Sequence, residues 1–143
     1  MIIVGDMFHS SANNEVQYFK IWRRQFHQLQ FDLVTGNHDI MDASVYEELE
    51  ILRYDALTLE NIHFVHDATD AAVNGLYVLS GHIHPGVRMF GYGRQSMRLP
   101  CFYFGQQYAV LPAFSHFTGM YMIEPQAGEP VFVLADKKVF KMQ

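Results

Sequence analysis

A group of polar side chains that could bind metal ions or move protons stands at the ends of apolar stretches of the sequence. In chain order they are Asp6, Asn37, His38, Asp39, His66, His82 and His84. A mixture of carboxylate, amide oxygen and imidazole suits borderline or harder divalent ions such as manganese, iron or zinc. The first chemistry that the residue types indicate is therefore that of a divalent-metal site.

The apolar stretches that precede these side chains have the composition and length of buried strands. They cover residues 1–4, 31–35, 62–65 and 76–79. In open α/β sheets, binding sites form beyond the carboxyl ends of the strands. We therefore expect the polar residues to meet at one edge of a sheet. The glycines beside them, at positions 5, 36, 81 and 86, allow the tight turns that bring backbone close to an ion.

Each of these features has an ordinary explanation when it is taken alone. A strand-end residue such as Asp6 is commonly a turn residue or a helix cap, and residues 37–39 alone could form a polar turn. His82 and His84 are two residues apart and project to the same side of an extended segment, which favours ligation. All of them occur in one chain, each after a predicted strand, and this combination favours a common site.

The elements that must position these residues are of the α/β type at first and mostly strands later. The spacing of apolar residues predicts a helix over about residues 13–29, whose apolar stripe is Phe19, Trp22, Phe26 and Leu29. A short helix is expected to start at Ser44, with Glu47 completing a capping box. Further strands are expected at residues 101–104, 108–111, 119–123, 131–134 and 139–142. We find no repeat or internal linker and expect one domain over residues 1–143.

Composition restricts the class of protein. Half of the 143 residues are hydrophobic, which is enough for a core. No apolar run reaches about eighteen residues and no signal peptide is visible, so we expect no membrane span. Cys101 is the single cysteine, which suits the cytoplasm. The net charge of −5 argues against broad electrostatic binding of nucleic acid, but bound metal ions would change the local field.

Four short motifs resemble, in their order along the chain, those of the calcineurin-like metallophosphoesterases. They are GDMFH, GNHD, FVHD and GHIHPG, which lie between Gly5 and Gly86. The later segments GRQSMRLPCFYF and VLPAFSHFTG are closer to one branch, the bacterial endonucleases associated with a DNA ligase in damage response. The resemblance implies an α/β fold, a four-layer α-β-β-α sandwich. It also implies a divalent-metal-dependent phosphoesterase, a phosphodiesterase or nuclease that acts in DNA repair.

The resemblance also implies a set of metal ligands. Asp6 matches the carboxylate that bridges two metal ions, while Asn37, His66 and His82 match the remaining ligands of one ion. His84 matches a ligand of the other ion. Manganese is the metal that we expect, with iron or zinc as alternatives. In such a site, the ions polarise the phosphodiester and generate a hydroxide nucleophile at neutral pH.

His38 matches the general acid of the family. Asn37 offers a neutral oxygen to a metal, whereas the next residue on the sharp turn points elsewhere and can donate a proton to the departing oxygen. Asp39 is expected to help orient the ring of His38.

The Asp-x-His pair that opens the family pattern has no counterpart in this sequence. The resemblance therefore predicts an N-terminally shortened member that lacks the first strand segment, with one good and one poor metal site and weak or no hydrolysis. A catalytically inactive module that keeps the fold and binds a metal or a partner is the alternative. Without the first strand, the edge of residues 1–4 would be uncovered, and we expect it to pair with a second copy of the chain.

Substrate contacts are expected outside the metal ligands. His9, three residues after Asp6, is a candidate, although it could instead cap the following helix. Arg94 and Arg98, with Arg88 before them, flank a glycine-rich loop and could hold phosphates, unless the loop is simply solvated. The expected substrate is a phosphodiester, with DNA as one candidate, and the resemblance suggests a DNA ligase or helicase partner.

Overall fold

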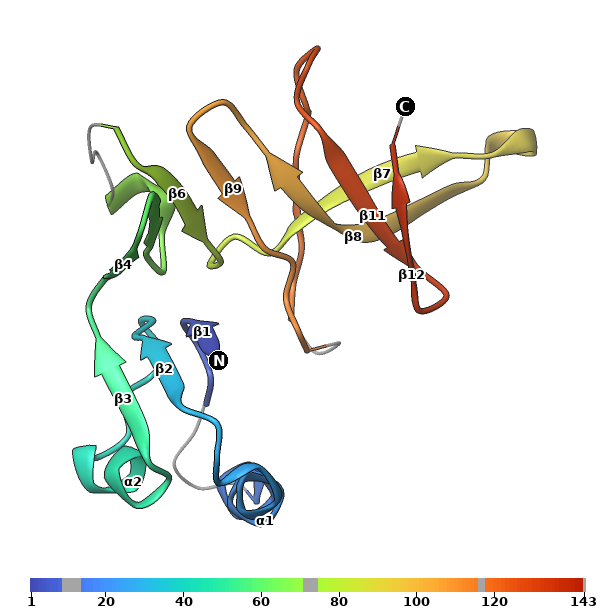
Figure 1. Ribbon diagram of the computed structural model, residues 1–143. Coiled ribbons are helices and arrows are strands. Elements are labelled where there is room, and N and C mark those ends of the chain that lie inside the picture. The colour runs from blue at the N-terminus through green and yellow to red at the C-terminus, as the bar shows by residue number, and fades with distance from the viewer. Residues whose placement is uncertain (9–13, 71–74, 116–117, 143) are drawn as a thin grey trace.

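The computed structural model describes residues 1–8, 14–70, 75–115 and 118–142. The strands form a three-stranded sheet and a 9-stranded sheet, which lie one above the other in Figure 1. The chain is thus an α/β protein built from two sheets, in agreement with the predicted sandwich class. No helix in the described part of the chain is long and apolar enough to cross a membrane.

The first sheet consists of three parallel strands. They are β1 (Ile2–Val4), β2 (Phe31–Val34) and β3 (Ile51–Tyr54), in the spatial order β1-β2-β3. Within the described residues, no strand lies beside β1 on its outer side. The edge position that the sequence predicted for residues 1–4 is therefore present, and the pairing of this edge with a second copy stays a prediction.

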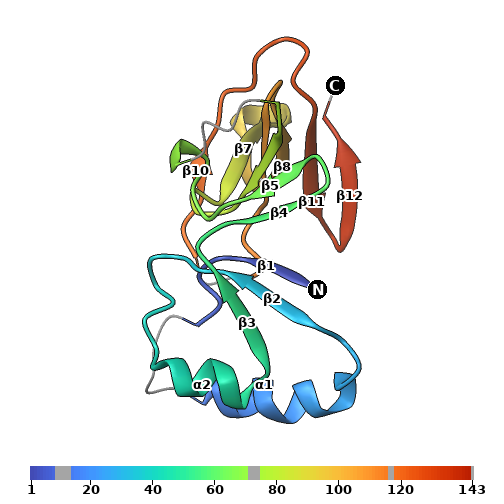
Figure 2. The ribbon, with the colours of Figure 1, turned by 60° about the vertical axis from the view of Figure 1, so that its left-hand side comes forward.

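Both α-helices cover the same face of the first sheet, as Figure 2 shows below the strands. They are α1 (Glu15–Arg23), continued by a 3-10 turn η1 (Arg24–Phe26), and α2 (Ala43–Glu48). Alternate residues of β2, Phe31 and Leu33, point to the helices and are fully buried. Tyr46 of α2 and Phe19 of α1 pack into the same core. Phe8, shortly after β1, is buried in this core as well.

The helices differ from the prediction at their ends. α1 ends at Arg23, where its buried guanidinium lies 4.6 Å from the ring centroid of Phe31 and donates to the Phe26 carbonyl. Phe26 and Leu29 therefore fall outside the α-helix, and Trp22, whose ring meets that of Phe31 edge to face, is the last residue of the predicted stripe within it. In α2 the cap is Asp42, whose side chain accepts from the backbone N–H of Ser44. The predicted start at Ser44, with its capping box, was wrong because the preceding carboxylate already caps the helix.

The second sheet contains the remaining strands in the order β10-β7-β8-β9-β6-β5-β4, with β11 on β8 and β12 on β11. Their bounds are β4 (Leu57–Leu59), β5 (Ile62–Phe64), β6 (Tyr77–Ser80), β7 (Pro85–Phe90), β8 (Ser96–Phe104), β9 (Tyr108–Val110), β10 (Tyr121–Met122), β11 (Val131–Ala135) and β12 (Lys138–Lys141). The 3-10 turns η2 (Ala68–Asp70) and η3 (Tyr92–Arg94) complete the described elements. The core of the second sheet contains Val87, Cys101, Val110, Val131 and Val133.

Three strands were not predicted, namely β3 of the first sheet and β4 and β7 of the second. β7 begins with Pro85 and Gly86, which are poor strand formers. Proline is nevertheless tolerated as the first residue of a strand. Pairing with β8 over the whole length of β7 supplies the stability that its local sequence lacks.

Candidate metal centre

The candidate site lies where parallel strands of the two sheets end against each other. β1 and β2 are parallel and present Asp6 and Asn37 beyond their carboxyl ends, while β5 and β6 are parallel and present His66 and His82. The backbone N–H of Gly81 donates to the His66 carbonyl over 3.1 Å. A Cβ at Gly81 would lie 2.9 Å from the Val4 carbonyl oxygen, so this loop contacts the end of β1 directly.

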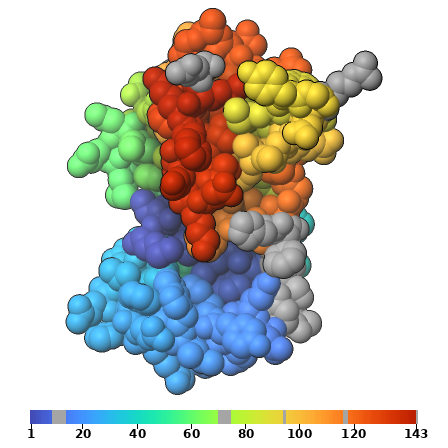
Figure 3. Space-filling view, turned by 90° about the vertical axis from the view of Figure 1, so that its right-hand side faces the viewer, coloured from blue at the N-terminus to red at the C-terminus, as the bar shows by residue number. Residues whose placement is uncertain are grey.

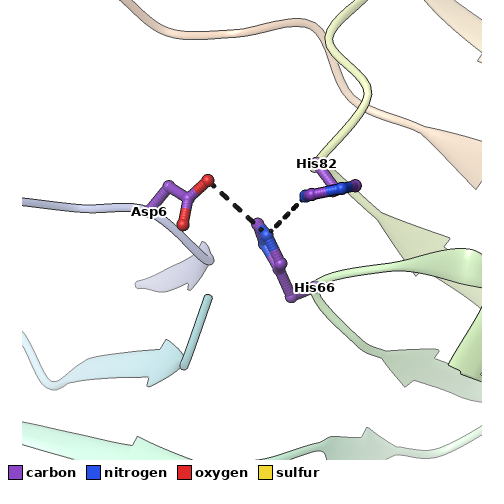
Figure 4. Close-up of side chains that lie close together, drawn as sticks. All are labelled: Asp6, His66 and His82. Carbon is purple, nitrogen blue, oxygen red and sulfur yellow. Dashed lines mark hydrogen bonds and ion pairs between the residues drawn. The ribbon is translucent and has the colours of Figure 1, made fainter. Parts of the chain in front are cut away.

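The side chains from these strand ends meet around the ring of His66. Its Nε2 atom lies 3.5 Å from Oδ2 of Asp6 and 3.0 Å from Oδ1 of Asn37. The same atom lies 2.9 Å from Nδ1 of His82. Figure 4 shows Asp6 and His82 on either side of His66, and one potential ligand atom from each of these three residues lies within 4.8 Å of the others. The structure therefore brings together Asp6, Asn37, His66 and His82.

The backbone at the site adopts a conformation that non-glycine residues rarely tolerate. Asp6, His82 and His84 have φ values of 51°, 46° and 48°, in the left-handed region. Such a conformation costs on the order of 1–3 kcal/mol for a residue with a Cβ. Glycine would remove this cost, and the chain instead carries a carboxylate and two imidazoles at these positions.

Neighbouring glycines allow the side chains to come this close. A Cβ at Gly5 would lie 1.9 Å from Nδ1 of His66, and a Cβ at Gly36 would lie 2.3 Å from Oδ1 of Asp6. No larger residue fits at either position without displacing a site residue. Glycine is therefore required at positions 5 and 36 for the turns to pack against the cluster.

The chemistry of the donors fits a divalent cation. The cluster offers one carboxylate, one amide oxygen and two imidazoles, a set that borderline divalent ions accept. Burial lowers the pKa of the His66 imidazole, and the Asp6 carboxylate acts in the opposite direction. The ring of His66 is thereby favoured in the neutral form, which is the form that ligates metals. The metal-ligand role of the cluster stays a prediction.

His84 lies beside the cluster and has a separate contact. Its Nδ1 atom is 3.3 Å from the carbonyl oxygen of Gly119. A hydrogen bond from Nδ1–H to a carbonyl leaves Nε2 with its lone pair and fixes the ring, an arrangement common to metal-binding histidines. Within the described residues, His84 is not part of the group of Asp6, His66 and His82.

Asp67 is a site residue that the sequence reasoning missed. Its Oδ2 atom lies 3.7 Å from Nε2 of His82, on the side of the ring opposite to the contact with His66. The backbone N–H of Thr69 donates to Asp67 and lowers the pKa of its carboxyl group. The available signal was its position directly after His66 in FVHD. A charged carboxylate here can orient the His82 ring.

Asp39 has a structural role that differs from the predicted one. It is buried, and its Oδ1 atom accepts from the backbone N–H groups of Met7 (2.8 Å) and Phe8 (3.3 Å). Its Oδ2 atom accepts from the N–H of Gly36 over 2.8 Å. Asp39 therefore ties the loop after β1 to the loop after β2. The expectation that it orients the ring of His38 stays a prediction.

The structure places one of the remaining predicted residues, His38, next to the cluster. The backbone N–H of His38 donates to Oδ1 of Asp6 over 3.0 Å, so this exposed residue adjoins the cluster. Arg98 lies on β8, and the backbone of Arg94 ends η3. His9 lies outside the described residues. The substrate contacts expected for His9, Arg94 and Arg98 stay predictions.

Comparison with known proteins identifies a similar solved structure. No family model matches the chain, and no curated protein matches it. Among solved structures, the crystal structure of Pseudomonas putida nuclease MPE is similar, with a TM-score of 0.82 and 30% sequence identity. The match covers 99% of this chain and 68% of that chain. It therefore extends over both sheets and the junction between them.

Proposed function

Because this chain belongs to the same family as the Pseudomonas putida nuclease MPE, we propose that it is a calcineurin-like metallophosphoesterase, a divalent-metal-dependent nuclease of DNA repair. The likeness supports a hydrolase that acts on phosphodiester bonds. Metal dependence, DNA as substrate and a role in repair are the parts that we add. The observation that carries the proposal is the convergence of Asp6, Asn37, His66 and His82 from four strand ends.

In this proposal the cluster holds divalent metal. Asp6, Asn37, His66 and His82 would bind one ion, and Asp6 would be shared with a second ion that His84 serves. Manganese is the proposed metal, with iron or zinc as alternatives. A bound divalent ion polarises a phosphodiester and lowers the pKa of a bound water, so that a hydroxide is available at neutral pH. Asp67, 3.7 Å from the far nitrogen of His82, would be a positioning residue for that ring.

His38 is the proposed general acid. Its backbone is anchored by the hydrogen bond to Asp6, whereas its side chain belongs to an exposed residue on the loop after β2. It can therefore approach a substrate at the cluster from the solvent side and donate a proton to the departing oxygen. Asp39 supports this function by holding the backbone on which His38 sits.

The test combines metal content with hydrolysis. The chain is dialysed against Mn²⁺, and bound metal is measured by atomic emission alongside hydrolysis of a small aryl phosphodiester and of labelled DNA. We expect bound manganese and weak hydrolysis that EDTA abolishes, both strongly reduced in His82→Ala. The matched control is His27→Ala, which removes an exposed histidine after η1 and should behave like the parent chain.

The outcomes separate the two candidate functions. If the parent chain binds manganese tightly but hydrolyses neither substrate, the inactive binding module is the better description. If His82→Ala binds as much metal as His27→Ala, the cluster is not the metal site. A DNA ligase or helicase partner, a cytoplasmic location and pairing through β1 remain expectations of the resemblance.

A further inference from the structure

Charge is distributed very unevenly along this chain. Residues 71–123 contain no aspartate or glutamate, and their only lysine or arginine residues are Arg88, Arg94 and Arg98. This segment therefore carries +3 and the rest of the chain −8, which together give the net charge of −5. A local excess of one sign in a chain of the opposite sign indicates a surface for a charged partner, here an anionic one.

The arginines belong to a hairpin that extends away from the body of the second sheet. β7 starts at Pro85, directly after His84, and β8 returns from Ser96, so the hairpin begins at the candidate metal centre. Figure 1 shows it in yellow, pointing to the right of the molecule, and Figure 3 shows its outer end as a yellow patch. The outer half of both strands is exposed.

Two of the arginines face each other across the hairpin. Arg88 of β7 is paired directly with Arg98 of β8. Residues paired in this way project from the same face with Cβ atoms about 5 Å apart, and like charges in this position are destabilising. Within the described residues, neither guanidinium makes an ion pair. An anion between them would replace the repulsion by charge-assisted hydrogen bonds, and a phosphate has the geometry for two guanidinium forks.

Exposed aromatic rings lie next to this arginine pair. Phe90 follows Arg88 by two residues on β7 and therefore lies on the same face, about 7 Å farther along the strand. Its exposed fraction is 78%, and that of Tyr92 in the following turn is 100%. A ring so exposed contributes nothing to the core of this chain. Such rings next to phosphate-binding arginines are the arrangement on which unpaired bases stack.

We propose that the β7–β8 hairpin is a nucleic-acid-binding arm. Arg88 and Arg98 together hold one backbone phosphate, and Phe90 and Tyr92 stack on unpaired bases beside it. Because β7 starts next to His84, a strand bound on this arm continues toward the candidate metal centre. The inference rests on the proposed function and adds to it the surface that holds the substrate.

The first experiment measures binding without hydrolysis. Fluorescence anisotropy of a labelled single-stranded DNA of mixed sequence is followed in EDTA at several salt concentrations. The double variant Arg88→Gln/Arg98→Gln is compared with Lys138→Gln/Lys141→Gln, which removes the same charge from the exposed strand β12. We expect the arginine variant to lose on the order of tenfold in affinity, with the slope of log K against log salt reduced by about 0.7, the value for one lost phosphate contact on a single strand.

The second experiment tests the aromatic contacts. Phe90→Ser/Tyr92→Ser should lower the affinity for single-stranded DNA on the order of tenfold with an unchanged salt slope, because stacking releases no counterions. Tyr18→Ser on α1, a tyrosine that is 67% exposed, is the matched control and should bind like the parent chain. If Phe90→Ser/Tyr92→Ser binds single-stranded DNA as tightly as the parent chain, the proposal that these rings stack on bases is wrong.

The arm and the nuclease proposal fail in different ways. If the arginine variant keeps the affinity and slope of the lysine control, the arm is wrong whether or not the chain hydrolyses DNA. If DNA binding depends on the hairpin but the chain with Mn²⁺ hydrolyses no DNA, the binding arm is supported and the nuclease assignment is wrong. Misfolding is excluded by the melting temperature, because removing a repulsive pair should leave the arginine variant at least as stable as the parent chain.

Discussion

The Nε2 atom of His66 lies 2.9 Å from the Nδ1 atom of His82, and the two rings meet edge to face with their centroids 4.7 Å apart. Two imidazole nitrogens at this distance share one hydrogen bond, so one nitrogen donates and the other accepts. Two charged rings could not make this contact, because both nitrogens would then be donors. The contact between the ends of β5 and β6 therefore requires at least one of the two rings to be neutral, and neutral imidazole is the form that binds metal.

Two substitutions of His82 distinguish the cost of its backbone conformation from the contribution of its imidazole to metal binding. Because His82 has φ 46°, His82→Gly should be more stable than His82→Ala by about 1 kcal/mol, although both lack the imidazole. Urea unfolding in EDTA measures this difference. Manganese binding should be lost equally in both variants, so greater metal affinity in the glycine variant would argue against ligation by His82.

Asp39 should contribute strongly to the stability of the fold, because its carboxylate accepts three backbone hydrogen bonds. Asp39→Ala leaves three backbone N–H groups, those of Gly36, Met7 and Phe8, without their acceptor. We expect a loss of about 3 kcal/mol or more in the free energy of unfolding, and a smaller loss in Asp39→Asn, which keeps one oxygen. Urea unfolding tests this, with the exposed Asp55→Ala as control. Equal stability of the two alanine variants would show that these hydrogen bonds contribute little.

His38 should affect turnover without affecting metal content. If it donates a proton to the leaving oxygen, His38→Ala should lower turnover by about 10²–10⁴-fold, the usual contribution of general acid–base catalysis. Its bound manganese should equal that of the parent chain, because the variant keeps the backbone N–H that donates to Oδ1 of Asp6. Loss of metal as large as in His82→Ala would make His38 a ligand instead.

Cys101 should be unreactive in the folded chain. It is fully buried on β8, opposite Val133 of β11, and burial raises the pKa of its thiol to about 11. Since the thiolate is the reactive form, an aromatic disulfide reagent at pH 8 should modify Cys101 only as fast as the chain unfolds. The urea-unfolded chain provides the reference rate. Rapid reaction under native conditions would mean that β8 and β11 separate readily.

Local patterns in the sequence were sufficient to identify most of the candidate site. A buried strand followed directly, or after one glycine, by a polar residue is a signal within a few adjacent positions, and it selected Asp6, Asn37, His66 and His82. The short apolar stretches before these residues located β1, β2, β5 and β6. These predictions succeeded because burial of a short strand depends mainly on its own composition.

Relationships between distant segments were decided only by the tertiary structure. Asp67 adjoins His82 because β5 and β6 pair in parallel, and Asp39 reaches Met7 because β1 lies beside β2. Arg88 faces Arg98 only in the register that the β7–β8 hairpin adopts. A shift of one residue in register would turn each side chain to the other face of the strand. The sequence determined which side chains were available, and strand pairing decided which of them meet.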